Sequence, residues 1–127
     1  ASKQQNDARP TLPDVTAHDD AAAEVLEDAA ARELAEEAGF GARDVRFVKR
    51  LSIAPGHMGF TINVLMATDL YPHDIPGDEP EPPELVRWPL SQIDELLAHE
   101  AFYEARAIAA LTLCLPQLRQ ALHDGNE

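Results

Sequence analysis

Three glutamates in one short stretch have the types and spacing to do chemistry. Glu33, Glu36 and Glu37 stand at positions i, i+3 and i+4, so a helix would place their carboxylates on one face with Cβ atoms about 5–6 Å apart. These like charges repel, and Arg32 offsets only part of that repulsion. Hard divalent ions such as Mg²⁺ or Mn²⁺ take oxygen ligands of this kind. By themselves the three carboxylates leave two interpretations open, a metal site and a solvated acidic face, and they favour the solvated face.

The glutamates belong to a segment with the pattern of a helix over residues 21–38. Alanine, valine and leucine recur there at helical spacing. Asp19 or Asp20 is a candidate N-cap, and Gly39 is a candidate for the glycine that ends the helix. A helix with these ends would hold the three carboxylates in a fixed relation to one another.

The middle of the chain has the pattern of strands. Residues 46–53 and 60–70 alternate apolar and polar side chains, and the glycine-containing residues 54–59 predict the turn between them. Residues 71–83 hold five prolines among acidic side chains, which predicts a stiff acidic loop. Residues 84–90 predict a short third strand.

The last third of the chain has the pattern of two helices. Ser91 is a candidate cap for the first helix, and the second runs from about residue 102 to 123 with Pro116 as a candidate kink. Residues 1–20 are mainly polar. They show neither the two-residue period of a strand nor the 3.6-residue period of a helix, which predicts a tail or linker. We therefore expect one domain over residues 21–124.

Composition excludes several classes of function. The chain has 127 residues, with 10 Lys and Arg against 23 Asp and Glu, for a net charge of −13. This charge disfavours binding to nucleic acid or to an anionic membrane surface. No apolar run approaches the length of about 18 residues that a membrane span needs. The single cysteine, Cys114, lies in an apolar run, which predicts a small buried side chain in a protein of the reducing cytoplasm.

The glutamate helix carries a family motif. Residues 32–40, Arg-Glu-Leu-Ala-Glu-Glu-Ala-Gly-Phe, resemble the REUxEExGU half of the Nudix box, and Glu24 stands eight residues before Arg32 as that box requires. Four later segments are similar to the bacterial ADP-compounds hydrolase branch of the Nudix family: residues 51–56, 69–72, 77–84 and 88–90. The similarity extends over residues 24–115, most of the chain.

The resemblance implies a fold and an activity. The fold would be an α/β/α sandwich with a mixed sheet. Members of this branch cleave the pyrophosphate of ADP-ribose, NADH and diadenosine polyphosphates, with AMP as one product, and they need Mg²⁺ or Mn²⁺. They form homodimers. We therefore expect a small-molecule nucleotide as the substrate and a second copy of the chain as a partner.

The resemblance also assigns roles to the residues of the motif. It implies that Glu33, Glu36 and Glu37 are catalytic residues that bind the metal or orient the water. Arg32 and Glu24 would hold these carboxylates in place.

Two loops supply further candidates through the same resemblance. The acidic loop offers Glu79 and Glu81 as a further catalytic carboxylate, against the alternative of a solvated loop. The turn between the strands offers Pro55, Gly56 and His57 as contacts to phosphate or ribose. The alternatives there are an ordinary turn glycine and an exposed histidine.

The sequence departs from the family upstream of the helix. His18 stands where the box has a glycine, and residues 20–23 lack the Pro-Gly or similar pair expected before Glu24. Only a mainly polar tail precedes the box, where family members have several strands, so we expect an N-terminally truncated or rearranged Nudix domain. Two functions stay open: a hydrolase, and a degenerate domain that binds nucleotide or assembles with a partner. The in-register motif disfavours a third, an acidic helical interaction domain.

Overall fold

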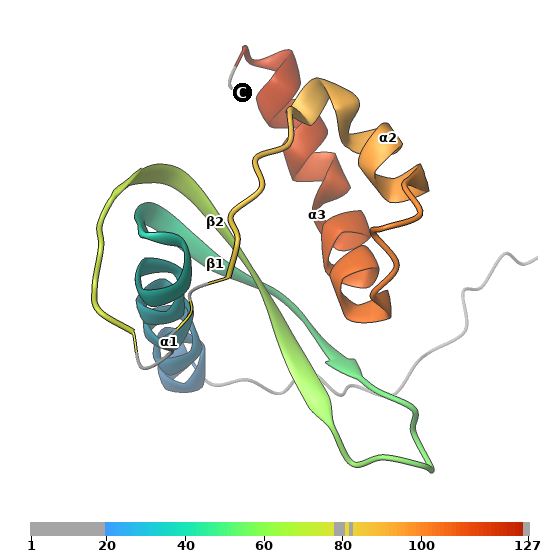
Figure 1. The fold of residues 1–127 in the computed structure, drawn as a ribbon. Coiled ribbons are helices and arrows are strands. Elements are labelled where there is room, and N and C mark those ends of the chain that lie inside the picture. Colours follow the sequence, from blue (N-terminus) through green and yellow to red (C-terminus); the bar gives the residue numbers. More distant parts are fainter. Residues whose placement is uncertain (1–19, 78–80, 82, 126–127) are drawn as a thin grey trace, which may run out of the picture.

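The computed structural model describes residues 20–77, 81 and 83–125. Their elements follow the order α1 (Asp20–Ala38), β1 (Phe40–Ser52), β2 (Thr61–Pro72), the 3₁₀ turn η1 (Leu90–Gln92), α2 (Ile93–Ala98) and α3 (Ala105–His123). Figure 1 shows α1 on one side of the two strands and α2 with α3 on the other. The described residues thus have the layers of the expected α/β/α sandwich.

The predicted end of the first helix is confirmed. Gly39 has φ 73°, a left-handed conformation that glycine adopts without the steric cost of a Cβ. Its N–H donates to the carbonyl of Ala35 at 3.2 Å, and β1 begins at the next residue, Phe40. The helix therefore joins the strand without a linker, which fixes the acidic last turn of α1 beside the sheet.

The two predicted central strands are confirmed, and both are longer than expected. They pair antiparallel from Phe40 opposite Pro72 to Ser52 opposite Thr61, with one register shift between Phe47 and Lys49. In the part of the chain that the structure describes, these two strands make up the sheet. The parallel pairing that a mixed sheet requires is not found in that part.

The prediction of a third strand over residues 84–90 is wrong. Residues 83–89 are described without regular structure, and η1 begins at Leu90. Pro89 has no N–H to donate to a neighbouring strand, which weakens any pairing at the end of this segment. Ser91 lies inside η1 and caps no helix. Instead, the Trp88 indole N–H donates to the Gln92 carbonyl at 2.6 Å and closes the turn.

The long C-terminal helix is confirmed with a later start. The Glu104 carboxylate accepts the N–H of Ala107 at 2.8 Å, so this residue caps α3. The Arg106 guanidinium beside it and this backbone hydrogen bond lower the pKa of Glu104. Pro116 lies inside the helix, as predicted. The predicted tail over residues 1–20 lies outside the described residues except for Asp20, the first residue of α1.

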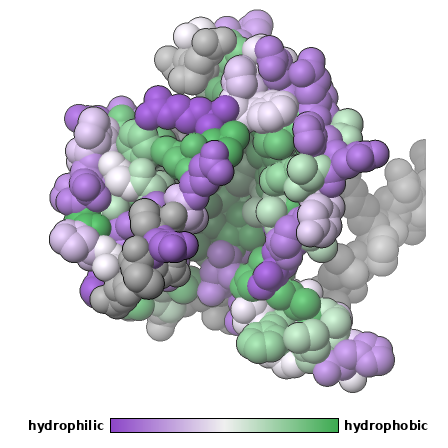
Figure 2. Space-filling model, viewed as in Figure 1, coloured by the Kyte–Doolittle hydropathy of each residue, from purple (hydrophilic) through white to green (hydrophobic). Residues whose placement is uncertain are grey.

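Few apolar side chains are buried in the described part of the chain. Among the described residues, the buried apolar set is Ala35 on α1, Val64 on β2, Ile93 on α2 and Cys114 on α3. Burial raises the pKa of the Cys114 thiol, and its predicted place in the interior is confirmed. Figure 2 shows hydrophobic residues in the hollow between the half that contains α1 and the half that contains α2 and α3.

Within the described ranges, no helix has both the length and the apolar character to cross a membrane.

Candidate active site

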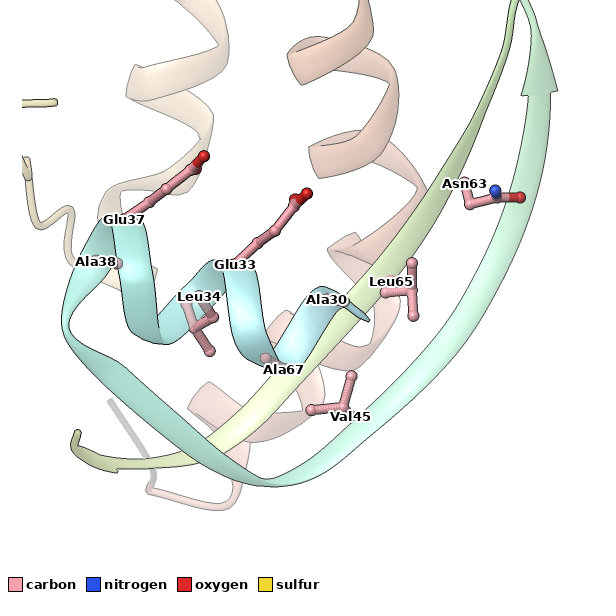
Figure 3. A pocket seen from close by; sticks show the side chains of 9 residues that line it. All are labelled: Ala30, Glu33, Leu34, Glu37, Ala38, Val45, Asn63, Leu65 and Ala67. Atoms are coloured by element: carbon pink, nitrogen blue, oxygen red, sulfur yellow. The ribbon is translucent and has the colours of Figure 1, made fainter. Parts of the chain in front are cut away.

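Two of the three glutamates share one groove. Glu33 and Glu37 lie one turn apart on α1, and Figure 3 shows their side chains extending side by side in the same direction. The groove lies between α1 and the sheet and encloses about 360 Å³. It is lined by Ala30, Glu33, Leu34, Glu37, Ala38, Val45, Asn63, Leu65 and Ala67. The side chains of Glu33 and Glu37 therefore line the same groove.

The sheet forms the other wall of this groove. Leu65 and Ala67 alternate along β2, and Val45 of β1 stands opposite Ala67. Side chains two residues apart share a face of a strand, so these three present one apolar surface to α1. Asn63 continues the same row and is the only amide in the lining. Chemically, the groove combines an anionic wall, an apolar wall and one amide.

The third glutamate is held by an arginine. The Arg32 Nε donates to the Glu36 carboxylate at 2.8 Å, with Glu36 24% and Arg32 77% exposed. An exposed ion pair stabilises by less than about 1 kcal/mol, so its main effect is to hold the direction of Glu36. These two residues line a second hollow of about 470 Å³ with Asp28, Ala29 and Glu33. Glu33 thus borders both hollows.

The donor set fits a magnesium-like ion that is completed by substrate. Among the described residues, no three His, Cys, Asp or Glu side chains gather closely enough to hold a metal ion. Mg²⁺ binds to proteins through one or two carboxylates, with water and substrate phosphate as its other ligands. Glu33 and Glu37, side by side in an open groove, supply such a pair. A third protein ligand is not required for this mode of binding.

The remaining residues assigned from the motif and the acidic loop lie elsewhere. Glu24 is exposed on α1, about two turns before Arg32. Glu81 is exposed in the loop after β2 and lines neither hollow. This loop passes close to α1, because a Cβ placed on Gly77 would lie 3.5 Å from the Glu36 carbonyl oxygen. Glu79 and His18 lie outside the described residues.

The turn residues are not brought to the glutamates. Pro55, Gly56 and His57 are exposed at the tip of the hairpin, and Figure 1 shows this tip well away from α1. The strands are long, and β1 pairs with β2 from Phe40 to Ser52, so they carry the turn away from the glutamates. Contact of these turn residues with phosphate or ribose stays a prediction, beside the alternatives of an ordinary turn glycine and an exposed histidine.

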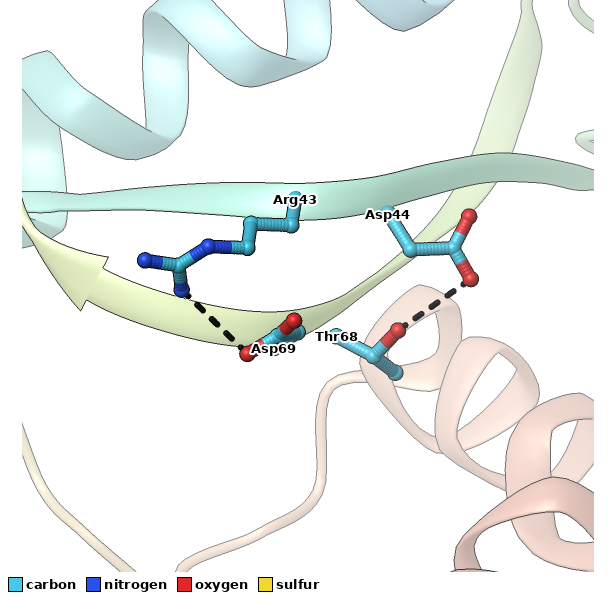
Figure 4. A network of polar contacts seen from close by, with 4 residues as sticks. All are labelled: Arg43, Asp44, Thr68 and Asp69. Carbon is cyan, nitrogen blue, oxygen red and sulfur yellow. Dashed lines mark hydrogen bonds and ion pairs between the residues drawn. The ribbon is translucent and has the colours of Figure 1, made fainter.

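Polar contacts join the two strands beside the helix. Figure 4 shows the Arg43 guanidinium donating to Asp69 and the Thr68 hydroxyl donating to Asp44, each at 3.3 Å. The Arg43 guanidinium also lies 4.8 Å from the centre of the Tyr71 ring. These contacts cross from β1 to β2 close to Gly39, where α1 ends. They stabilise the part of the sheet that positions the acidic helix.

The sequence analysis missed Asn63. Within residues 61–67 it is a polar side chain on the face that also carries Leu65 and Ala67. Alternation along the strand shows that these three side chains share one face. It does not show which of the two faces the acidic helix covers, and that depends on the position of α1.

Comparison with known proteins gives one consistent result. Residues 21–111 match the NUDIX domain family. The ADP compounds hydrolase NudE of Escherichia coli (strain K12) is 50% identical over 90 residues, which cover 71% of this chain and 48% of that protein. A crystal structure of an ADP compounds hydrolase matches with a TM-score of 0.69 and 47% identity, over 75% of this chain and 51% of that one. The chain spans about half the length of these relatives.

Proposed function

This chain belongs to the NUDIX domain family, and from that premise we propose that it hydrolyses the pyrophosphate bond of ADP-linked compounds and releases AMP. ADP-ribose, NADH and diadenosine polyphosphates are the candidate substrates. The observation that carries the proposal is the pair of glutamates, Glu33 and Glu37, in one groove of the α1 surface. The similarity to ADP compounds hydrolases supports the choice of substrate class.

The residues of α1 have separate tasks in this proposal. Glu33 and Glu37 hold Mg²⁺ or Mn²⁺ in the groove, and Arg32 holds Glu36 in its ion pair next to them. When bound, the divalent ion supplies charge neutralisation of the diphosphate and activation of water. The apolar wall of the groove excludes bulk water from one side of the substrate, which strengthens the electrostatic contacts made there.

The reaction is a displacement at phosphorus. Water adds to a phosphorus of the diphosphate, and the bond from that phosphorus to the bridging oxygen breaks. ADP-ribose would give AMP and ribose 5-phosphate. NADH would give AMP and the reduced nicotinamide mononucleotide. Glu36 and the loop carboxylates Glu79 and Glu81 are the candidates to accept the proton of the water.

We also propose that the chain forms a homodimer. In the described residues the sheet has two strands, and an isolated two-stranded hairpin is marginally stable in water. Large apolar side chains are exposed on and around it, including Phe60, Leu70, Leu85 and Val86. Pairing of the sheet edges between two copies would cover such surface. Light scattering over a concentration series should give twice the mass of the chain, and a monomer at every concentration would refute this.

Release of AMP tests the enzymatic proposal. The chain is incubated with Mg²⁺ and ADP-ribose or NADH, and AMP is quantified by chromatography. Glu33→Gln should slow release by more than about 100-fold, since even residues that only orient metal ligands contribute 10–100-fold. Glu95→Gln, an exposed carboxylate on α2, is the matched control and should keep the rate of the parent chain.

The same assay separates the hydrolase from the alternative. Nucleotide binding without any AMP would support a degenerate domain that binds nucleotide or assembles with a partner. The two-stranded sheet of the described residues is the observation that favours this alternative. Release of AMP that survives Glu33→Gln combined with Glu37→Gln would refute the assigned site.

A further inference from the structure

The groove on α1 extends beyond the two glutamates. Figure 3 shows Glu37 and Ala38 at one end of the lining and Asn63 at the other, past Ala30. Asn63 and Ala67 are four residues apart on β2, which corresponds to about 14 Å along a strand. A diphosphate at the glutamates would therefore leave a length of groove unfilled on the Asn63 side.

This unfilled part has the chemistry of a site for a flat heterocycle. Figure 3 shows Leu65 and Ala30 between Asn63 and the glutamates, so these two side chains supply the apolar surface next to Asn63, whereas Val45 stands opposite Ala67 at the other end of the groove. The whole groove, including the part at the glutamates, has a volume of about 360 Å³, at the low end of the range of small-molecule sites, which are mostly apolar with a few placed polar groups. In the part of the chain that the structure describes, no hydrogen bond joins the exposed Asn63 amide to another side chain. One donor and one acceptor are thus available at the end of the apolar surface.

We propose that the Asn63 end of this groove binds a nitrogen heterocycle of the dinucleotide substrate, with the ring against Leu65 and its polar edge at the Asn63 amide. A side-chain amide pairs with the donor and acceptor edge of adenine, and the carboxamide of nicotinamide offers the same pair. This inference rests on the proposed function for the identity of the substrate. It makes Asn63 a residue that determines specificity and has no part in the displacement at phosphorus.

The two sources of such a ring are distinguishable. NADH carries adenine and nicotinamide, whereas ADP-ribose carries adenine alone. An Asn63 contact to the nicotinamide ring would affect NADH and spare ADP-ribose. A contact to adenine would affect both compounds.

Saturation-transfer NMR with NADH and ADP-ribose in EDTA tests the inference without any turnover. Ring protons of the bound compound should receive saturation from the parent chain, and Asn63→Ala should remove most of that transfer. Thr61→Ala is the matched control, because Thr61 is exposed on the same face of β2 but does not line the groove. Transfer to nicotinamide protons identifies that ring, and transfer to adenine protons in both compounds identifies adenine. Equal transfer in the parent chain and in Asn63→Ala would overturn the proposal.

Kinetics give a second readout. Asn63→Ala and Asn63→Leu should each raise KM for the compound whose ring is bound by about tenfold, with kcat little changed. Unfolding temperatures within a few degrees of the parent chain show that the variants are folded. If no compound is hydrolysed but the NMR result holds, the proposed function fails while the groove assignment stands. If AMP is released and neither variant changes KM for any substrate, the groove assignment fails while the proposed function stands.

Discussion

Replacing Gly41 with alanine should destabilise the chain through one neighbour, Tyr71. A Cβ placed on Gly41 would lie 2.6 Å from the Tyr71 hydroxyl oxygen and closer still to the ring. The two residues are directly opposite in the register of β1 and β2. The ring therefore lies across the space that an alanine methyl group would need.

The cost can be worked from these contacts. Overpacking in a packed core costs about 1–3 kcal/mol. The methyl group here would meet the outer end of the Tyr71 side chain, which is exposed and can move aside, so the cost is at the low end of that range, about 1 kcal/mol. Displacing the ring also loses its contact with the Arg43 guanidinium, about 0.5–1 kcal/mol at an exposed position. Alanine is better than glycine inside a strand by about 0.5–1 kcal/mol, which offsets the second term. Gly41→Ala should thus lower the free energy of unfolding by about 1 kcal/mol.

Urea denaturation followed by circular dichroism measures the loss in the free energy of unfolding, and a double-mutant cycle shows whether Tyr71 causes it. In a Tyr71→Ala background the obstacle is gone, so Gly41→Ala should be neutral or stabilising by about 0.5–1 kcal/mol. An equal loss of stability in both backgrounds would show that Tyr71 is not the obstacle, and that the backbone at Gly41 causes the loss.

Three further outcomes are expected. The Arg106 guanidinium lowers the pKa of Glu104 from 4.5, so the stability that this cap contributes is present above pH 4.5 and is lost as the pH falls through the lowered pKa. Glu104→Ala should lower the unfolding temperature at pH 7 more than at pH 3. Burial raises the pKa of Cys114 above 9.0, so its contribution to stability is complete below pH 9 and is lost as the pH rises through the raised pKa; Cys114→Val should reduce the loss of stability above pH 9 in urea titrations. Arg32→Gln should release Glu36, a candidate to accept the proton of the water, and slow the release of AMP by about 10–100-fold, measured by chromatography.

The parts of the fold that depend on local chemistry were predictable from the sequence. The end of α1 was one of them, because a glycine directly after a helical pattern is typical of a helix C-terminus, and Gly39 has the expected positive φ. The two central strands were another, because β-forming residues flank a turn that contains Gly56. The spacing of Glu33 and Glu37 was sufficient to predict that they share a face.

The parts that depend on distant partners were not predictable. Residues 84–90 have the composition of a strand, but composition does not show whether a neighbouring strand is there to pair with them. The distance of the turn from the glutamates was not predictable either, because it follows from the length over which β1 and β2 pair; the exposed position of His57 agrees with one of the two alternatives stated for it. Asn63 was not predicted as a site residue, because the sequence does not show which face of β2 lies against α1.

The proposed active site requires Glu33 and Glu37 together to hold a divalent metal ion. This is measured by titrating the chain with Mn²⁺ and following free Mn²⁺ by electron paramagnetic resonance. The parent chain and the control variant Glu95→Gln should bind Mn²⁺ with the same affinity. Glu33→Gln and Glu37→Gln should each weaken binding by more than about 100-fold, as removal of a direct ligand exceeds the effect of removing a supporting residue. Unchanged Mn²⁺ affinity in both variants would contradict the account.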